Sequence, residues 1–130
     1  MDAYDLQDTL VHINYNALTY AELITNINNA RLIYRPLRPF TIITAQEPST
    51  AIRQAIREMV AREFPNCRAV YFVEGSEATV ARAKAGTLRR INASSFTDNN
   101  RRILAAIRRQ IPGLPLYIMT PARKREPYDP

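Results

Sequence analysis

The clearest pattern of hydrophobic and polar positions along the chain lies in residues 40–64. Residues 40–45, Phe-Thr-Ile-Ile-Thr-Ala, form a short β-branched run that is typical of a buried strand. Apolar side chains then recur at helical spacing over residues 50–64, and Ser49 stands where an N-cap residue is expected. The pattern predicts a strand, a turn and an amphipathic helix.

A second unit of the same kind follows directly. Residues 69–73 form another apolar strand pattern, and Ser76 is placed to cap a helix that runs to about residue 85. Gly86 offers a C-terminal stop for that helix. Two consecutive strand–helix units predict parallel strands joined by right-handed crossovers.

The N-terminal third is less regular. Thr19 and Glu22 form a capping-box pattern, which predicts a helix that ends near residue 29. Before it, residues 4–12 fit a helix and residues 10–15 fit a strand, and the sequence leaves both open.

The C-terminal third predicts one more helix and one more strand. Residues 99–110 show an apolar stripe at helical spacing, and either Thr97 or Asp98 can cap this helix. Residues 114–119 have the composition of a final strand. Residues 87–95 fit either a continued helix or an irregular segment.

These elements together predict an α/β fold with a small, mostly parallel sheet of three or four strands and flanking helices. It is built from two βα units, an Arg-rich helix and a final strand. The fourth strand requires residues 10–15 or 31–35 to join the sheet. We expect residues 1–119 to form a single domain and residues 120–130, which contain three prolines, to form an exposed tail.

Composition narrows the class of protein. No run approaches the ~20 uninterrupted apolar residues of a membrane span. The acidic N-terminus, residues 1–5, lacks the basic region and apolar run of a secretory signal. Cys67 is the only cysteine and cannot form an internal disulfide. We therefore expect a cytoplasmic location and no membrane partner.

The net charge of +6 is distributed very unevenly. Residues 1–30 carry four acidic residues and no basic one, whereas residues 82–125 carry eleven basic residues against Asp98 alone. This asymmetry favours an acidic partner, or else a chain whose acidic N-terminal segment packs beside its own basic half. Sixteen of the eighteen basic residues are arginine. Arginine suits bidentate contact with phosphate or carboxylate, although a biased gene composition would give the same ratio.

The helix predicted for residues 99–110 carries the sharpest charge pattern. Four arginines fall on the face opposite its apolar stripe, and two more lie shortly upstream of it. Such a face can contact nucleic-acid phosphates or an acidic protein, and it can equally be a solvated helix face. The candidate residues for binding an acidic partner are Arg89, Arg90, Arg101, Arg102, Arg108 and Arg109.

Most familiar catalytic and metal motifs are missing. Three glycines cannot form a Gly-rich phosphate loop, and one cysteine with one histidine cannot supply the usual zinc ligands. Asp8 and His12 have the i,i+4 spacing of an ordinary surface pair on a helix. The sequence predicts no cofactor and no metal.

Two glutamates remain as candidates for catalysis or ligand binding. Glu47 and Glu74 each follow a predicted strand, and ligands of parallel sheets bind outside the carboxyl ends of the strands. Paired carboxylates can divide acid and base roles, whereas single carboxylates near helix starts simply stabilise the helix dipole. Thr44, Ser49 and Ser76 would be the neighbouring polar groups.

The leading hypothesis is a small, basic, non-enzymatic module that binds an acidic partner through its Arg-rich helix face. The partner is either a nucleic-acid backbone or a protein that the module regulates or inhibits, which would suit a phage or a mobile element. One alternative is an enzyme that handles a small ligand or a phosphate at the Glu47/Glu74 edge of the sheet. A structural subunit of a homo-oligomer is the other alternative.

Overall fold

The computed structural model of the chain describes residues 1–129 and contains one main sheet of six strands. The first five strands in spatial order run parallel, and the last is antiparallel to its neighbour. In that order they are β5 (Cys67–Val73), β4 (Phe40–Ala45), β1 (Asp2–Tyr4), β6 (Ser95–Asp98), β7 (Leu116–Met119) and β8 (Arg125–Pro127). A separate antiparallel pair is formed by β2 (Val11–His12) and β3 (Arg31–Leu32).

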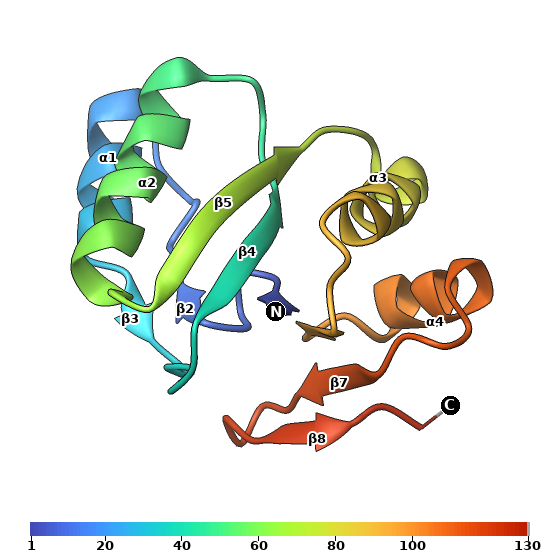
Figure 1. Cartoon of the computed structure of the whole chain (residues 1–130). Coiled ribbons are helices and arrows are strands. Elements are labelled where there is room, and N and C mark those ends of the chain that lie inside the picture. The colour runs from blue at the N-terminus through green and yellow to red at the C-terminus, as the bar shows by residue number, and fades with distance from the viewer. Residues whose placement is uncertain (130) are drawn as a thin grey trace.

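Four helices cover the two faces of the main sheet (Figure 1). One face packs against α1 (Tyr20–Asn28) and α2 (Thr50–Glu63), and the other against α3 (Glu77–Arg90) and α4 (Arg101–Gln110). Each face has its own hydrophobic core. Side chains from strands therefore alternate between two buried environments, and apolar alternation alone cannot mark these strands.

The α/β class and the mostly parallel sheet are confirmed, but the predicted number of three or four strands is too small. The sequence did not reveal three strands of this sheet: β1 and β6, which lie in its middle, and β8 at its edge. β1 is only three residues long, and β6 reads Ser-Phe-Thr-Asp, so neither has a recognisable strand pattern. Residues 10–15 and 31–35 contribute to the separate β2–β3 pair instead of to the main sheet.

The predicted caps have mixed outcomes. The hydroxyl of Ser49 accepts a hydrogen bond from the amide of Ile52 at 3.3 Å, and that of Thr19 accepts from Glu22 at 3.1 Å, as expected. The helix predicted for residues 99–110, α4, is capped by Asn100, whose side chain accepts from two amides of the first turn. Thr97 and Asp98, the predicted caps, are instead buried in β6.

The helix α3 continues five residues past the predicted stop. Gly86 lies inside it, exposed and with open space around it. Thr87 and Leu88 are buried beyond this glycine. Burial of these side chains outweighs the roughly 1 kcal/mol that glycine costs inside a helix.

Residues 120–130, for which the sequence predicts an exposed tail, include part of the sheet. Residues 125–127 form β8, which pairs with β7. Tyr128 follows it and is buried in the core beneath α4, where its carbonyl accepts a hydrogen bond from Arg108. In the part of the chain that the structure describes, no helix is long and apolar enough to cross a membrane.

The structure predicts that the C-terminal segment stabilises the fold. Tyr128→Ala should lower the free energy of unfolding by about 3 kcal/mol, since it removes a buried aromatic ring. Urea denaturation of the purified variant measures this. The control is Glu126→Ala, an exposed position of β8 that should change stability by less than about 0.5 kcal/mol. Equal stability of the wild type and the Tyr128→Ala variant would contradict the packing described.

Candidate functional site

The order of the strands creates a crevice at the carboxyl edge of the sheet. From β1 the chain continues to β4 and β5 on one side, and it then returns to β6 and β7 on the other side. The direction of winding thus reverses between β1 and β6, and ligands of open α/β sheets bind outside the strand ends at such a switch point. Asp5 follows β1 directly, and Asp98 is the last residue of β6.

A buried lysine from α3 lies between these two aspartates. The ammonium of Lys84 is 2.9 Å from Oδ1 of Asp5 and 3.1 Å from Oδ2 of Asp98. The relative exposures of Asp5, Lys84 and Asp98 are 7%, 3% and 1%. We call these three residues the buried triad. Charged side chains are almost never buried to this degree unless they are paired.

The buried triad contains one more negative than positive charge when all three groups are ionised. Burial, and then the charge of Asp98, raise the pKa of Asp5 to about 7, against the opposing effect of Lys84. The two carboxylates hold the pKa of Lys84 above its usual range although burial opposes this. The surplus negative charge is therefore an unfavourable feature of the fold, which a proton or a cation would relieve.

The turns that follow β1 and β6 donate hydrogen bonds to the carboxylates of the triad. The hydroxyl of Thr9 donates to Oδ2 of Asp5 at 3.4 Å, and the amide of Asn100 donates to Oδ1 of Asp98 at 3.0 Å. Asn99, with its amide oriented to donate, reaches Asp98 and the Gln7 carbonyl at 3.1 and 3.2 Å. The bond from Asn99 to Gln7 thus joins the two turns beside the carboxylates.

The triad opens into a hollow of about 270 Å³, which we call the central hollow. Asp5, Lys84 and Asp98 all line it, together with Thr44 from the end of β4. Thr44 is 4% exposed, and within residues 1–129 its hydroxyl makes no hydrogen bond. This hydroxyl therefore has no partner within the described part of the protein and is available to a ligand.

The backbone next to the hollow is strained at one position. Asp8 lines the hollow and has a φ of 59°, in the left-handed region that non-glycine residues rarely adopt. Its carboxylate lies 2.6 Å from Nδ1 of His12, so the pair expected from their spacing exists, but in a turn rather than on a helix. Strained residues of this kind concentrate at functional sites.

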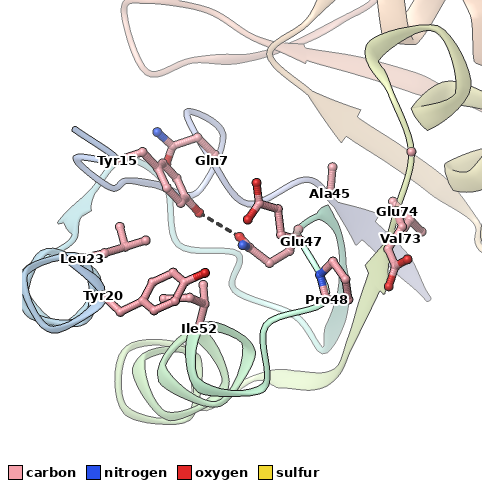
Figure 2. Close-up of a pocket in the computed structure, with 12 residues that line it drawn as sticks. Gln7, Tyr15, Tyr20, Leu23, Ala45, Glu47, Pro48, Ile52, Val73 and Glu74 are labelled. Carbon is pink, nitrogen blue, oxygen red and sulfur yellow. Dashed lines mark hydrogen bonds between the residues drawn. The ribbon is translucent and has the colours of Figure 1, made fainter. Parts of the chain in front are cut away.

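A larger cavity of about 740 Å³, the aromatic cavity, adjoins the central hollow and shares Gln7 and Ala45 with it. Figure 2 shows Tyr15 and Tyr20 on one side of it and Glu47 with Pro48 on the other. The hydroxyl of Tyr15 donates to the side chain of Gln46 at 3.3 Å. This cavity gives the carboxyl edge a mixed aromatic and polar surface.

The two glutamates predicted as a pair both line the aromatic cavity, but their situations differ. Glu74 forms an ion pair with Arg53 at 2.8 Å, and Arg53 also donates to the Gln46 and Glu47 carbonyls. Within the described residues, the carboxylate of Glu47 has no cationic partner. Glu74 therefore serves chiefly to join the turns after β4 and β5, and Glu47 alone keeps a free carboxylate.

The three hydroxyl residues predicted beside these glutamates lie in different places. Thr44 faces the central hollow and not the aromatic cavity. The hydroxyl of Ser49 is occupied in capping α2, and Ser76 is exposed at the start of α3 without a capping bond. The structure thus brings together Glu47 and Glu74, and it places Thr44 with the buried triad.

The six candidate arginines divide into two groups. Arg89 donates to the carbonyl of Gln110, and Arg108 donates to the carbonyl of Tyr128 at 3.5 Å, so both have roles within the fold. Arg102 lies 3.7 Å from Glu77 in a highly exposed pair. The remaining three are exposed and have no acidic partner in the part of the chain that the structure describes: Arg90, Arg101 and Arg109.

The sequence analysis missed the buried triad, although a signal existed for each member. Asp5 directly follows a strand and Asp98 ends one, much as Glu47 and Glu74 stand after theirs, but the strands themselves were not recognised. Lys84 occurs four residues after Val80 and four before Leu88, on the apolar stripe of its own helix. A lysine at a core position requires a buried anionic partner, which the sequence could have indicated.

The chain has no detected similarity to known proteins. Comparisons with protein-family models, with curated proteins and with solved structures give no match. Among residues 1–129 there is also no group of three or more His, Cys, Asp and Glu side chains arranged to hold a metal ion. The function has to be inferred from the residues at the carboxyl edge.

The surplus charge of the triad predicts opposite effects of two substitutions. Asp5→Asn should raise the free energy of unfolding at pH 8 by about 2 kcal/mol, because it removes the unbalanced buried charge. The gain should disappear towards pH 4, where Asp5 of the folded wild type is protonated and carries no charge. Because the folded state binds this proton more tightly than the unfolded state, the wild type loses the corresponding stability as the pH rises through about 7. Lys84→Met should instead cost about 3–5 kcal/mol at pH 8.

Urea denaturation at pH 4, 6 and 8 measures both effects. Lys124→Met, at an exposed position, is the control and should change stability by less than about 0.5 kcal/mol. A destabilising effect of Asp5→Asn at pH 8 would contradict the surplus negative charge.

Proposed function

We propose that this protein binds a phosphate monoester in the central hollow and transfers its phosphoryl group to Asp5. The observation that carries the proposal is the buried triad, in surplus negative charge, opening into a hollow that also holds the unbonded hydroxyl of Thr44. A fold that retains an unfavourable buried charge at its switch point does so at a cost in stability, which is the usual sign of a functional site.

The surplus charge favours a divalent cation as the companion of the phosphate. Mg²⁺ is commonly bound by one or two carboxylates together with phosphate oxygens of the substrate, and it does not require a full set of protein ligands. Asp5 and Asp98 would supply the carboxylates. With Mg²⁺ present, the site changes from net negative to net positive, which suits a phosphate dianion.

The three side chains would divide the work of phosphoryl transfer. Lys84 is bonded to Oδ1 of Asp5, which leaves Oδ2, the acceptor of a 3.4 Å hydrogen bond from Thr9, as the attacking oxygen. Lys84 stabilises charge on the phosphoryl oxygens, and the hydroxyl of Thr44 donates to one of them. Carboxylates are known to act as nucleophiles towards phosphoryl groups.

The reaction has two steps. Oδ2 of Asp5 forms a bond to phosphorus while the bond from phosphorus to the alcohol oxygen breaks, and the departing oxygen takes up a proton from the solvent. Water then attacks phosphorus, the bond to Asp5 breaks, and inorganic phosphate leaves with Asp5 restored. Gln7 lines the central hollow, but its side-chain amide is occupied by two 2.9 Å hydrogen bonds with the backbone of Ile13. An amide cannot act as an acid, so Gln7 does not protonate the departing oxygen.

The first test uses 4-nitrophenyl phosphate, whose leaving group needs no proton donor. We expect Mg²⁺-dependent release of nitrophenol by the wild type and a loss of at least about 100-fold in kcat/KM for Asp5→Asn. Thr44→Val should lose about 10-fold. The matched control is Thr41→Val in the same strand, whose hydroxyl is buried away from the hollow and has no hydrogen-bond partner.

Two outcomes would overturn the proposal. One is a wild type that releases no nitrophenol with Mg²⁺, Mn²⁺ or Ca²⁺ and acquires no covalent phosphate on Asp5 from acetyl phosphate, as read by mass spectrometry. The other is an Asp5→Asn variant as active as the wild type.

A second candidate function rests on the exposed arginines of α4. Within residues 1–129 neither Arg101 nor Arg109 forms an ion pair, with the acidic N-terminal segment or with any other carboxylate. Asp5, the N-terminal carboxylate that is ion-paired and buried, is bonded to Lys84 instead. The face therefore keeps the charge needed to bind an acidic partner, either nucleic-acid backbone or an acidic protein.

This second function predicts binding of nucleic acid that depends on salt. Wild-type protein should bind labelled single-stranded DNA at ~50 mM salt and lose most of that affinity at ~200 mM. The double variant Arg101→Gln/Arg109→Gln should weaken binding about 10-fold at the lower salt. The control Arg38→Gln/Arg68→Gln removes the same charge from exposed positions near the starts of β4 and β5 and should not weaken binding. Fluorescence anisotropy measures both. No binding at low salt would leave only the protein partner.

A further inference from the structure

Three concave surfaces adjoin along the carboxyl edge of the sheet. The central hollow shares Gln7 and Ala45 with the aromatic cavity, and it shares Asp8 and Asn99 with a third hollow of about 330 Å³. The proposed phosphate site therefore lies between two further spaces. A ligand anchored there by its phosphate can extend in both directions.

The third hollow, which we call the arginine hollow, is built to receive an anion. It is lined by Arg31 from β3 and by Arg123 from the turn between β7 and β8. Within residues 1–129 neither guanidinium has an ion-pair partner or a side-chain hydrogen bond. The one acidic residue lining this hollow, Asp8, is occupied by His12 at 2.6 Å. Two free guanidinium groups at one concave surface suit bidentate binding of a phosphate.

The position of Arg123 is fixed by its backbone. Its φ is 62°, in the left-handed region, and the turn is closed by hydrogen bonds between Thr120 and both Arg123 and Lys124 at 2.9 Å. A non-glycine residue in this conformation is strained, and the hydrogen bonds of the turn must offset that strain. The strain places a cationic side chain beside the arginine hollow.

The aromatic cavity on the other side suits a planar ring. Tyr20 is 64% exposed and Tyr15 is 39% exposed, so their rings are available for stacking. Stacking of a base on an aromatic side chain favours binding of single-stranded nucleic acid. The free carboxylate of Glu47 can accept a hydrogen bond from an amino group on such a ring (Figure 2).

We infer that the substrate is the phosphorylated end of a single-stranded nucleic acid. The terminal phosphate monoester lies in the central hollow, the unpaired terminal base stacks in the aromatic cavity, and the next backbone phosphate binds Arg31 and Arg123. This assignment rests on the proposed phosphoryl transfer. A sugar phosphate or a mononucleotide carries no second phosphate and leaves the arginine hollow unused, whereas a strand uses all three spaces. The cationic edge of a chain with net charge +6 favours such a polyanion.

The test compares four kinds of substrate with the full chain in Mg²⁺. They are short single-stranded oligonucleotides with a 5′ or a 3′ phosphate, the corresponding mononucleotides, the nucleoside 3′,5′-bisphosphate, and 4-nitrophenyl phosphate. We expect kcat/KM for one of the phosphorylated oligonucleotides to exceed that of the mononucleotide at least about 10-fold. A bisphosphate that equals the oligonucleotide would show that the second phosphate alone is read and would overturn the assignment to a strand.

Matched variants locate the second phosphate. Arg31→Gln/Arg123→Gln should raise KM for the oligonucleotide at least about 10-fold and affect the mononucleotide much less. Arg38→Gln/Arg68→Gln removes the same charge from two exposed positions at the amino edge and should leave both substrates unchanged. An equal rise in KM for the oligonucleotide in both double variants would show that only the overall charge matters, and it would overturn the inference.

Binding to the inactive Asp5→Asn variant separates this inference from the proposed function. Fluorescence anisotropy should show tighter binding of the phosphorylated oligonucleotide than of the same strand with a terminal hydroxyl, and Tyr20→Ala should weaken it about 10-fold. Tighter binding without any hydrolysis by the wild type would retain the ligand and reject the chemistry. Hydrolysis of 4-nitrophenyl phosphate without any preference for the phosphorylated strand would do the reverse.

Discussion

The structure depends on one buried interaction, the contact of Lys84 with Asp5 and Asp98. It connects α3 to the two central strands across the point where the winding of the sheet reverses. Removing three charges from water is expensive, and only close pairing makes it tolerable. Because the pairing leaves one carboxylate in surplus, the fold is held together by a contact that remains electrostatically incomplete without a proton or a cation.

That incompleteness links stability to function. A hydrophobic triplet of similar volume would stabilise the same place at least as well, since buried ion pairs rarely exceed apolar packing. The charged version gives the chain a carboxylate of raised pKa, a fixed cation and an open hollow in one place. These are the components that the proposed phosphoryl transfer requires, and under that proposal they give a reason for three charged groups to be buried at the switch point.

The segment between β1 and β4 contributes much of the lining of the carboxyl edge. It folds back over the strand ends as β2, α1 and β3, and from there it contributes Tyr15, Tyr20 and Arg31 to two of the three concave surfaces. The sheet thus supplies the reactive groups from rigid strand ends, and the inserted segment supplies the aromatic and cationic surroundings. Rigid positioning of the first set and adaptable presentation of the second is the usual division in binding sites built on a scaffold.

The sequence by itself determined the class of fold, the units β4–α2 and β5–α3, and the caps Ser49 and Thr19. These follow from local chemistry, because helix stripes, caps and β-branched runs are properties of neighbouring residues. Only the tertiary structure decided that Asp5 and Asp98 end adjacent strands and that Lys84 joins them. It also decided that Arg89 and Arg108 are used inside the fold while Arg101 and Arg109 stay exposed. Contacts between residues 79 positions apart, such as Asp5 and Lys84, depend on strand order, and short central strands buried on both faces leave no periodic pattern from which that order can be predicted.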